Sequence, residues 1–196
     1  MVSLIYSEYF MSDRLKPSVY VRLTRREDFA ILAPLYVRSF AEPPWGEEND
    51  EAEVLIDFER YIKSRLTVFS SAVTDQTVVG AAVAFPIWEM PSVSRLLSER
   101  EREDLYMAEL FVAPTHRQRR AGYLLTLVRM VAGQEMGFRR FTVRTSIHQP
   151  AIIRLYTHHF GATIAAHDEV ISPKLIDGHR VMAPDTRVIL VGDIPK

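Results

Sequence analysis

A basic turn in the middle of the chain is the first stretch whose residues could do chemistry. Residues 115–122, THRQRRAG, separate a strand-like run, AELFVAP, from an apolar helix-like run, YLLTLVRMVAGQEM. The first N–H groups of a helix lack partners within the helix, and the helix dipole favours negative charge beside them. The order strand, basic turn, helix therefore predicts an anion site that suits a pyrophosphate. The simpler alternative is a solvated basic turn.

A carboxylate in the strand before this turn is the second candidate. Strand alternation over 106–112 places Met107, Glu109 and Phe111 on one face of a sheet and their neighbours on the other. A carboxylate on a central strand is costly unless it is hydrogen-bonded or functional. Glu109 is therefore either a hydrogen-bonded structural carboxylate or a group that accepts a proton in a reaction.

The elements that must position these residues follow from the hydrophobic pattern. After the turn, apolar residues recur at helical spacing, so this helix must bury a broad face, most simply on the sheet: Leu124, Leu125, Val128, Val131 and Ala132. The expected strands are 19–23, 68–73, 77–85, 106–112, 140–145, 163–171 and 187–192, with a connection over 172–186.

Three further helices are expected. The first covers 24–40, with a capping box formed by Thr24 and Glu27 and an interruption at Pro34. The second covers 50–65. The charged stretch 92–105 predicts a surface helix inserted before the strand that holds the carboxylate.

Composition excludes several classes of protein. The 196 residues are 47% hydrophobic and 25% charged with a net charge of −1, which gives no general attraction to nucleic acid or to an anionic membrane. Without cysteine there are no disulfides, thiolate metal sites or cysteine nucleophiles. No apolar run approaches the ~20 residues of a membrane span. We therefore predict a cytoplasmic protein with neither nucleic acid nor membrane as a partner.

Two other features complete the survey of the chain. Residues 1–18 form an N-terminal extension that contains Ile5, Tyr6, Tyr9 and Phe10, so we expect it to dock on the domain formed by 19–196 or on a partner subunit, as in a homodimer. The histidines at 158, 159 and 167 do not predict a metal site. Adjacent histidines on a helix diverge, and no carboxylate is spaced to complete a ligand set.

The basic turn resembles the pyrophosphate loop of the GNAT superfamily of acyl-CoA-dependent N-acetyltransferases. That loop reads R/Q-x-x-G-x-G/A after a strand ending V-x-P, and Val112, Pro114, Arg117 and Gly122 fall in register with it. Arg120 stands where the first glycine is expected, and residue 118, a glutamine, occupies another frequent glycine position. Either the backbone there suits a side chain, or the Arg120 guanidinium itself reaches the phosphates.

A second segment, IHQPAIIRLYTHHFGA, resembles the family's N-x-x-A-I-x-L-Y segment, a short helix with a tyrosine that protonates the departing CoA thiolate in many members. Tyr156 matches this tyrosine, and Gln149 takes the place of the asparagine, followed by Pro150 at a favourable first helical position. Gly161 comes one residue later than usual after the tyrosine, which could rotate the end of the helix.

The resemblance implies a mixed α/β fold with a central, mostly antiparallel sheet of about seven strands flanked by helices. It implies acetyl-CoA as co-substrate, Tyr156 as a catalytic residue, and a thioester carbonyl bonded by a backbone N–H at or beside Val112. The residues expected to contact CoA are Leu110, Phe111, Val112, Arg117, Gln118, Arg119, Arg120, Ala121, Gly122, Tyr123, Gln149, Ile152 and Tyr156.

The acceptor would sit opposite CoA, beside the first interhelical loop, residues 88–104 and residues 172–186. Trp45 and Glu47 in that loop would form an aromatic and acidic wall for a cationic amine, unless Trp45 instead fills the core. Attack requires a neutral amine, and Glu109 is our first choice as the base, with His148 as a weaker alternative.

The sequence therefore predicts an N-acetyltransferase that moves acetyl from acetyl-CoA to a primary amine of a small molecule or peptide by direct attack in a ternary complex. Within the same class, another acyl donor or a hydroxyl acceptor is an alternative. A CoA-binding regulatory module without turnover is the alternative from another class.

Overall fold

A seven-stranded sheet forms the centre of the computed structural model, which describes residues 19–43, 45–176 and 179–195. The strand order is β1-β2-β3-β4-β5-β7-β6, and every neighbouring pair is antiparallel except β4 with β5. The strands are β1 (Tyr20–Leu23), β2 (Val68–Thr74), β3 (Thr77–Pro86), β4 (Leu105–Val112), β5 (Arg140–Ser146), β6 (Thr163–Ile176) and β7 (His179–Asp193). This confirms the expected mixed α/β fold. The N-terminal extension lies outside the described residues.

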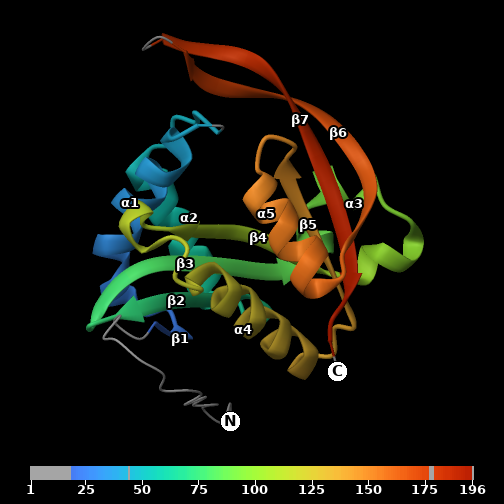
Figure 1. Cartoon of the computed structure of the whole chain (residues 1–196), viewed down its shortest axis with the longest axis horizontal. Coiled ribbons are helices and arrows are strands. Elements are labelled where there is room, and N and C mark those ends of the chain that lie inside the picture. Colours follow the sequence, from blue (N-terminus) through green and yellow to red (C-terminus); the bar gives the residue numbers. More distant parts are fainter. Residues whose placement is uncertain (1–18, 44, 177–178, 196) are drawn as a thin grey trace.

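Helices cover both faces of this sheet (Figure 1). On one face, α1 (Phe29–Ala41) and α2 (Glu51–Lys63) bury an aromatic cluster that includes Phe58 and Phe111. On the other face, α4 (Ala121–Glu135) packs on β1 to β4, and α5 (Pro150–Arg154) leads into a helical turn, η5 (Leu155–His159), whose Tyr156 packs against Phe141 of β5. Within the described residues, no helix is long and apolar enough to cross a membrane.

The first helix starts and runs differently from the sequence expectation. The predicted Thr24–Glu27 capping box is wrong, because the Arg25 N–H donates to Asp28 Oδ2 at 2.8 Å. Asp28 is preferred because it is buried and also accepts two hydrogen bonds of 2.7 Å from Arg22. A short 3-10 turn, η1 (Arg26–Asp28), leads into α1, which continues through Pro34 without a break.

The stretch expected to be one inserted helix, residues 92–105, holds part of one short helical piece and all of another, and a further piece precedes it. These are η2 (Ile87–Glu89), α3 (Pro91–Ser94) and η3 (Glu99–Glu103). Pro91 starts a new helix, because it lacks the N–H that would continue the preceding turn. The Ser98 hydroxyl and N–H both donate to Glu101, which fixes the start of the third piece.

A β-bulge in β4 changes which side chains share a face. The β3–β4 register shifts between Val83 and Phe85, opposite residues 107–108 of β4. Met107 therefore packs into the cluster below α4 and α5, whereas Phe111 packs below α1 and α2. The expected alternation is wrong for Met107, because the extra residue reverses the facing of the strand. Glu109 still shares the α1 face with Phe111, where Tyr36 of α1 hydrogen-bonds it.

The sheet opens between β4 and β5 (Figure 1). These strands pair only at Leu105 with Phe141 and at Tyr106 with Thr142. From Met107 onward, the described part of β4 has no partner strand on its β5 side. The two strands therefore diverge and leave backbone N–H and C=O groups of β4 facing the gap.

The last two strands form a long hairpin where a connection was expected over 172–186. The pairing of β6 with β7 extends from Thr163 and Val191 to Ile176 and His179. Figure 1 shows this hairpin arching past the ends of α1 and α5. Pro173 and Pro184 obscured it in the sequence. They are tolerated because β5 pairs with β7 no farther than Arg187, so this part of the hairpin has only edge strands.

Candidate active site

One cavity of about 1060 Å³ lies at the gap between β4 and β5. It extends from the basic turn at the start of α4 to the space between α1 and the β6–β7 hairpin. Every residue predicted to belong to the site lines this cavity except Arg119 and the alternative base, His148. The turn and Glu109, which are close in sequence, thus meet the distant Tyr156 at a single opening.

The basic turn has the backbone of a glycine loop without the glycines. Gln118 has a φ of 59° and Arg120 a φ of 65°, both in the left-handed region. A side chain in this region costs about 1 kcal/mol or more, which is why glycine is usual there. The turn therefore keeps the backbone shape that favours glycine although it carries side chains, and the contact of the Arg120 guanidinium with the phosphates stays a prediction.

Helix α4 begins directly after this turn, and its first N–H groups are available to a ligand. Gly122 lies in the first turn of the helix. A Cβ added to it would meet no atom closer than Leu110 Cδ2 at 4.0 Å, so protein packing does not require glycine. Arg117 braces the turn from outside: its Nε donates to the Val112 carbonyl at 3.0 Å, and its Nη1 pairs with Glu42 at 2.8 Å.

Glu109 is a partly buried carboxyl group on the α1 side of the gap. Burial raises its pKa to about 7, with the charge of Glu47 adding to the increase and a hydrogen bond from Tyr36 opposing it. A group with this pKa is present in both protonation states near neutral pH. It can therefore accept a proton and release it again.

Tyr156 lies on the α4 side, with its hydroxyl held by a buried arginine. The Tyr156 side chain is buried, and its hydroxyl accepts a hydrogen bond of 2.9 Å from Arg129 Nη2. Because this bond occupies a lone pair, the phenolic proton is free to point elsewhere. The sequence reasoning singled out Tyr156 but missed Arg129.

Arg129 has an acceptor for each N–H of its guanidinium, although it is fully buried. The acceptors are the carbonyls of Leu125, Val83 and Glu109, the Thr126 hydroxyl and Tyr156. All of them are neutral, and no described carboxylate pairs with this charge. Val83 and Glu109 flank the β4 bulge, so the guanidinium also satisfies carbonyls at this interruption of the ladder.

A π-helical turn accounts for the late glycine after Tyr156. Helix α5 passes into η5, a π-helix over Leu155–His159, before Gly161 adopts a left-handed φ of 64°. One inserted residue is the usual origin of such a turn. The π-helical turn thus accommodates the extra residue around the tyrosine, and the Tyr156 hydroxyl lies within hydrogen-bond distance of Arg129.

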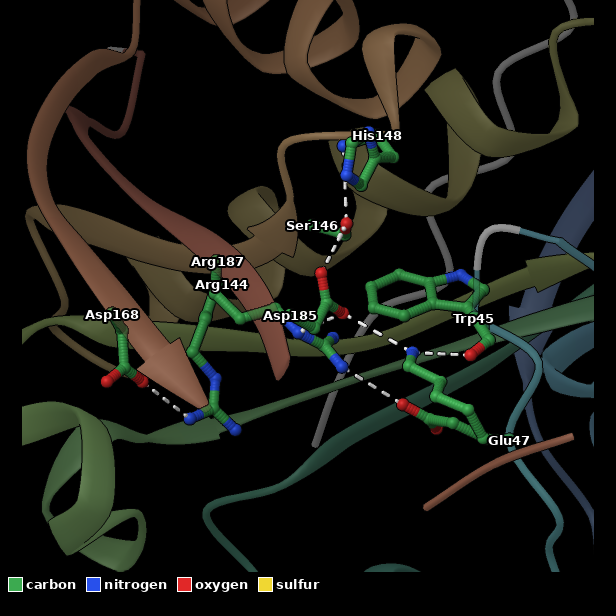
Figure 2. A network of polar contacts seen from close by, with 9 residues as sticks. Trp45, Glu47, Arg144, Ser146, His148, Asp168, Asp185 and Arg187 are labelled. Carbon is green, nitrogen blue, oxygen red and sulfur yellow. Dashed lines mark hydrogen bonds and ion pairs between the residues drawn. The ribbon is translucent and has the colours of Figure 1, made fainter. Parts of the chain in front are cut away.

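Trp45 and Glu47 are bound into a polar network with the β6–β7 hairpin (Figure 2). The Arg187 guanidinium lies 4.4 Å from the Trp45 ring centroid, and its Nη2 pairs with Glu47 at 3.1 Å. Lys174 donates to the Trp45 carbonyl and pairs with Asp185, which also pairs with Arg187 at 2.8 Å. The predicted aromatic and acidic wall therefore already has cations of the same chain against it. Its role toward an amine stays a prediction.

Three histidines line the cavity, namely His116, His158 and His159, whereas His148 does not. The His116 ring is hydrogen-bonded to the Thr115 hydroxyl at 2.9 Å within the basic turn. His148 is exposed, and its backbone N–H donates to the Ser146 hydroxyl. Among the described residues, no group of three histidines or carboxylates is arranged to hold a metal ion.

The parted strands and the basic turn before α4 define an acetyltransferase type of α/β fold. The family model described as "Acetyltransferase (GNAT) family" matches residues 30–162, which include the basic turn and Tyr156, and the chain belongs to that family. A comparison with curated protein sequences finds no match.

Solved structures with the same fold are distant in sequence. A ribosomal-protein-alanine N-acetyltransferase from Brucella melitensis is 15% identical at a TM-score of 0.69, covering 89% of this chain and 99% of its own. YncA, a putative acetyltransferase from Salmonella typhimurium solved with acetyl-CoA, is 15% identical at a TM-score of 0.69. The match covers 91% of this chain and 95% of YncA. A phosphinothricin acetyltransferase from Sinorhizobium meliloti, also solved with acetyl-CoA, is 15% identical at a TM-score of 0.69. The match covers 90% of this chain and 88% of that protein.

Proposed function

We propose that the protein is an N-acetyltransferase that moves acetyl from acetyl-CoA to a primary amine by direct attack. The observation that carries this proposal is the single cavity lined by the basic turn, Tyr156 and Glu109. An anion-binding element, a hydroxyl and a carboxyl with a pKa near neutrality are what a thioester donor and an amine acceptor require. The family membership supports the same reaction.

The basic turn and the start of α4 suit the pyrophosphate of CoA. The N–H groups of residues 121–123 would bind the phosphate oxygens, and the missing Cβ of Gly122 leaves room for their approach. Arg120 and Arg154 also line the cavity, and neither has an ion pair among the described residues. When bound, acetyl-CoA supplies an acetyl group activated as a thioester.

Glu109 and Tyr156 would move the protons of the reaction. The amine nitrogen bonds to the acetyl carbon, the carbon–sulfur bond breaks, and the products are an amide and a free thiol. Glu109 accepts the proton that the amine loses, and Tyr156 gives a proton to the departing sulfur. Unpaired N–H groups of β4 beyond Met107 face the gap and would stabilise the carbonyl oxygen as it gains charge.

Arg129 would act on this reaction through Tyr156. Its hydrogen bond fixes the direction of the phenol, and its buried positive charge favours the negative charge that forms when the phenol gives up its proton. Arg129 is thus a positioning residue rather than a group that contacts the substrates.

The test measures thiol release from acetyl-CoA with purified protein and a library of primary amines, together with the binding heat of acetyl-CoA. We expect acetyl-CoA to bind and thiol to be released only when an accepted amine is present. Binding without turnover on any amine would favour a CoA-binding regulatory module. A cytoplasmic location and a homodimer stay predictions, to be checked by fractionation and by light scattering.

A further inference from the structure

Basic side chains on α5 and η5 line the cavity and are open to solvent. Arg154 ends α5, and His158 follows four residues later on η5, so the two side chains share a face of one continuous helical segment. Both residues line the cavity and are exposed, as is the neighbouring His159. None of the three has an ion pair or a side-chain hydrogen bond with another described residue. These basic groups are therefore available to a ligand in the cavity.

Ring contacts place the end of η5 against the first turn of α4. The His159 ring centroid lies 5.6 Å from that of Tyr123 at an interplanar angle of 73°, and Phe160 stacks on Tyr123 at 5.4 Å. Tyr123 is the third residue of α4, directly after the basic turn. The end of the basic segment therefore adjoins the turn that suits a pyrophosphate, although it belongs to a separate element.

No described carboxylate of the cavity wall lies on α4, α5 or η5. The described carboxylates that line the cavity are Glu42 and Glu47, between α1 and α2, and Glu109 on β4. Glu42 reaches the basic turn, where it pairs with Arg117 at 2.8 Å. The charge of Arg117 is therefore balanced within the protein, whereas the charge of Arg154 is not.

CoA carries two kinds of phosphate that need different partners. Its pyrophosphate suits the N–H groups at the start of a helix. Its 3′-phosphate is a monoester, which carries about −1.5 to −2 charges near pH 7 and offers three acceptor oxygens, as a phosphorylated side chain does. Arginine makes strong, charge-assisted hydrogen bonds to such a group, and a histidine ring can donate one in either protonation state. The basic segment beside the turn matches this second phosphate.

We infer that Arg154 and His158 form a second anion subsite, which binds the 3′-phosphate of CoA apart from the turn that takes the pyrophosphate. Both side chains donate to the phosphate oxygens, so the protein distinguishes CoA from its 3′-dephospho form. This inference rests on the proposed use of acetyl-CoA and names residues that select this co-substrate.

The test is titration calorimetry with acetyl-CoA and 3′-dephospho-acetyl-CoA, which differ only in this phosphate. We expect the wild type to bind acetyl-CoA about tenfold more tightly, as one charge-assisted hydrogen bond at an exposed site provides. Adenosine 3′,5′-bisphosphate should likewise bind more tightly than adenosine 5′-monophosphate. The ratio of the two acetyl-CoA affinities should fall toward one as salt is added, because exposed charges are screened.

A double variant, Arg154→Ala with His158→Ala, tests the assignment of the subsite. It should bring the affinity ratio close to one by weakening the binding of acetyl-CoA, with the affinity for the 3′-dephospho form near that of the wild type. Because both residues are exposed, the melting temperature should change little. Arg38→Ala is the matched control, since it removes an exposed arginine of α1 outside the cavity and should leave the ratio unchanged.

The other outcomes are distinct. Equal affinity of the wild type for both forms would overturn the subsite while leaving acetyl-CoA binding and the proposed function intact. A ratio unchanged in the double variant would overturn the role of Arg154 and His158, and a lower ratio in Arg120→Gln would then assign the 3′-phosphate to the turn. No binding heat with either form, together with no thiol release on the amine library, would overturn the proposed function itself and this inference with it.

Discussion

Glu109 links protonation to both chemistry and stability. Burial and the charges of Glu47 and Asp57 raise its pKa to about 7, against the hydrogen bond from Tyr36 and the charge of Arg129. In the unfolded chain the group titrates near its ordinary value of 4.5, so the folded protein holds a proton that the unfolded chain has lost between these two values. This contribution to stability is present at low pH and is lost as pH rises from about 4.5 to about 7.

Glu109→Gln should therefore gain stability while losing activity. Its melting temperature should exceed that of the wild type at pH 8, and the difference should shrink toward zero as pH falls to about 4.5. Its kcat/KM for the amine should fall about 10²-fold, and the wild-type rise in rate with a midpoint near pH 7 should disappear. Calorimetry and a pH–rate profile measure the two effects. An unchanged profile would assign Glu109 to structure.

Tyr156 and Arg129 should behave as one catalytic unit. Tyr156→Phe should lower kcat by about 10²-fold with acetyl-CoA affinity near that of the wild type, because it removes one oxygen and little volume. Arg129→Lys keeps the charge but loses the fork that holds the phenol, so it should also lower kcat. If Arg129 acts through Tyr156, the effect of Arg129→Lys on kcat should vanish in the Tyr156→Phe background.

Thr126→Val is the matched control for this double-mutant comparison of Arg129 and Tyr156. It removes another hydrogen-bond partner of Arg129 and leaves the bond to Tyr156, so kcat should change little while stability falls. An equal loss of kcat from Arg129→Lys in both backgrounds would show that Arg129 acts through the fold alone.

At the scale of elements, the start of α4 should reveal whether the turn binds phosphate. Gly122→Ala places a methyl group in open space. Because alanine favours a helix more than glycine does, the free energy of unfolding should rise by up to about 1 kcal/mol and the melting temperature by a few degrees. The same methyl should lower acetyl-CoA affinity by about tenfold or more in titration calorimetry, because it fills the approach to the helix N–H groups. Gln134→Ala, at the far end of α4, should leave the affinity unchanged.

Local sequence patterns predicted the elements but not the features that refine them. Tyr156 could be located because its helix carries a recognisable segment, and the late Gly161 signalled the insertion that the π-turn absorbs. The β4 bulge has no comparable signal, since Met107 and Glu109 alternate normally in the sequence. Arg129 was missed because its acceptors come from β3, β4, α4 and η5, and a helical periodicity counts only apolar residues.

At the scale of the molecule, the network around Arg187 joins the 45–47 loop to the β6–β7 hairpin. Arg187→Gln leaves the buried Asp185 with one fewer cation and Glu47 without its arginine partner. The free energy of unfolding should therefore fall by about 2 to 4 kcal/mol. The Michaelis constant should rise for the amine more than for acetyl-CoA, because the basic turn lies outside this network. Chemical denaturation and steady-state kinetics measure both.

Arg26→Gln is the control, since it breaks an exposed ion pair with Glu59 of equally good geometry, 2.7 Å, and should cost no more than about 1 kcal/mol. Equal destabilisation by both substitutions would show that the Arg187 network contributes no more than a surface pair.

The short pairing of β4 with β5 divides the sheet into two stiff halves, β1 to β4 and β5 to β7. We call these halves leaves, and the β4–β5 pairing that joins them is the hinge. Long antiparallel ladders stiffen each leaf, whereas only two residue pairs, at Leu105 and Tyr106, connect the leaves through the sheet. Away from this hinge, the described ties across the gap include Arg129 with Tyr156 and Arg187 with Glu47. The compliance of the gap is therefore set by side chains, and single substitutions can change it while the backbone of both leaves stays as it is.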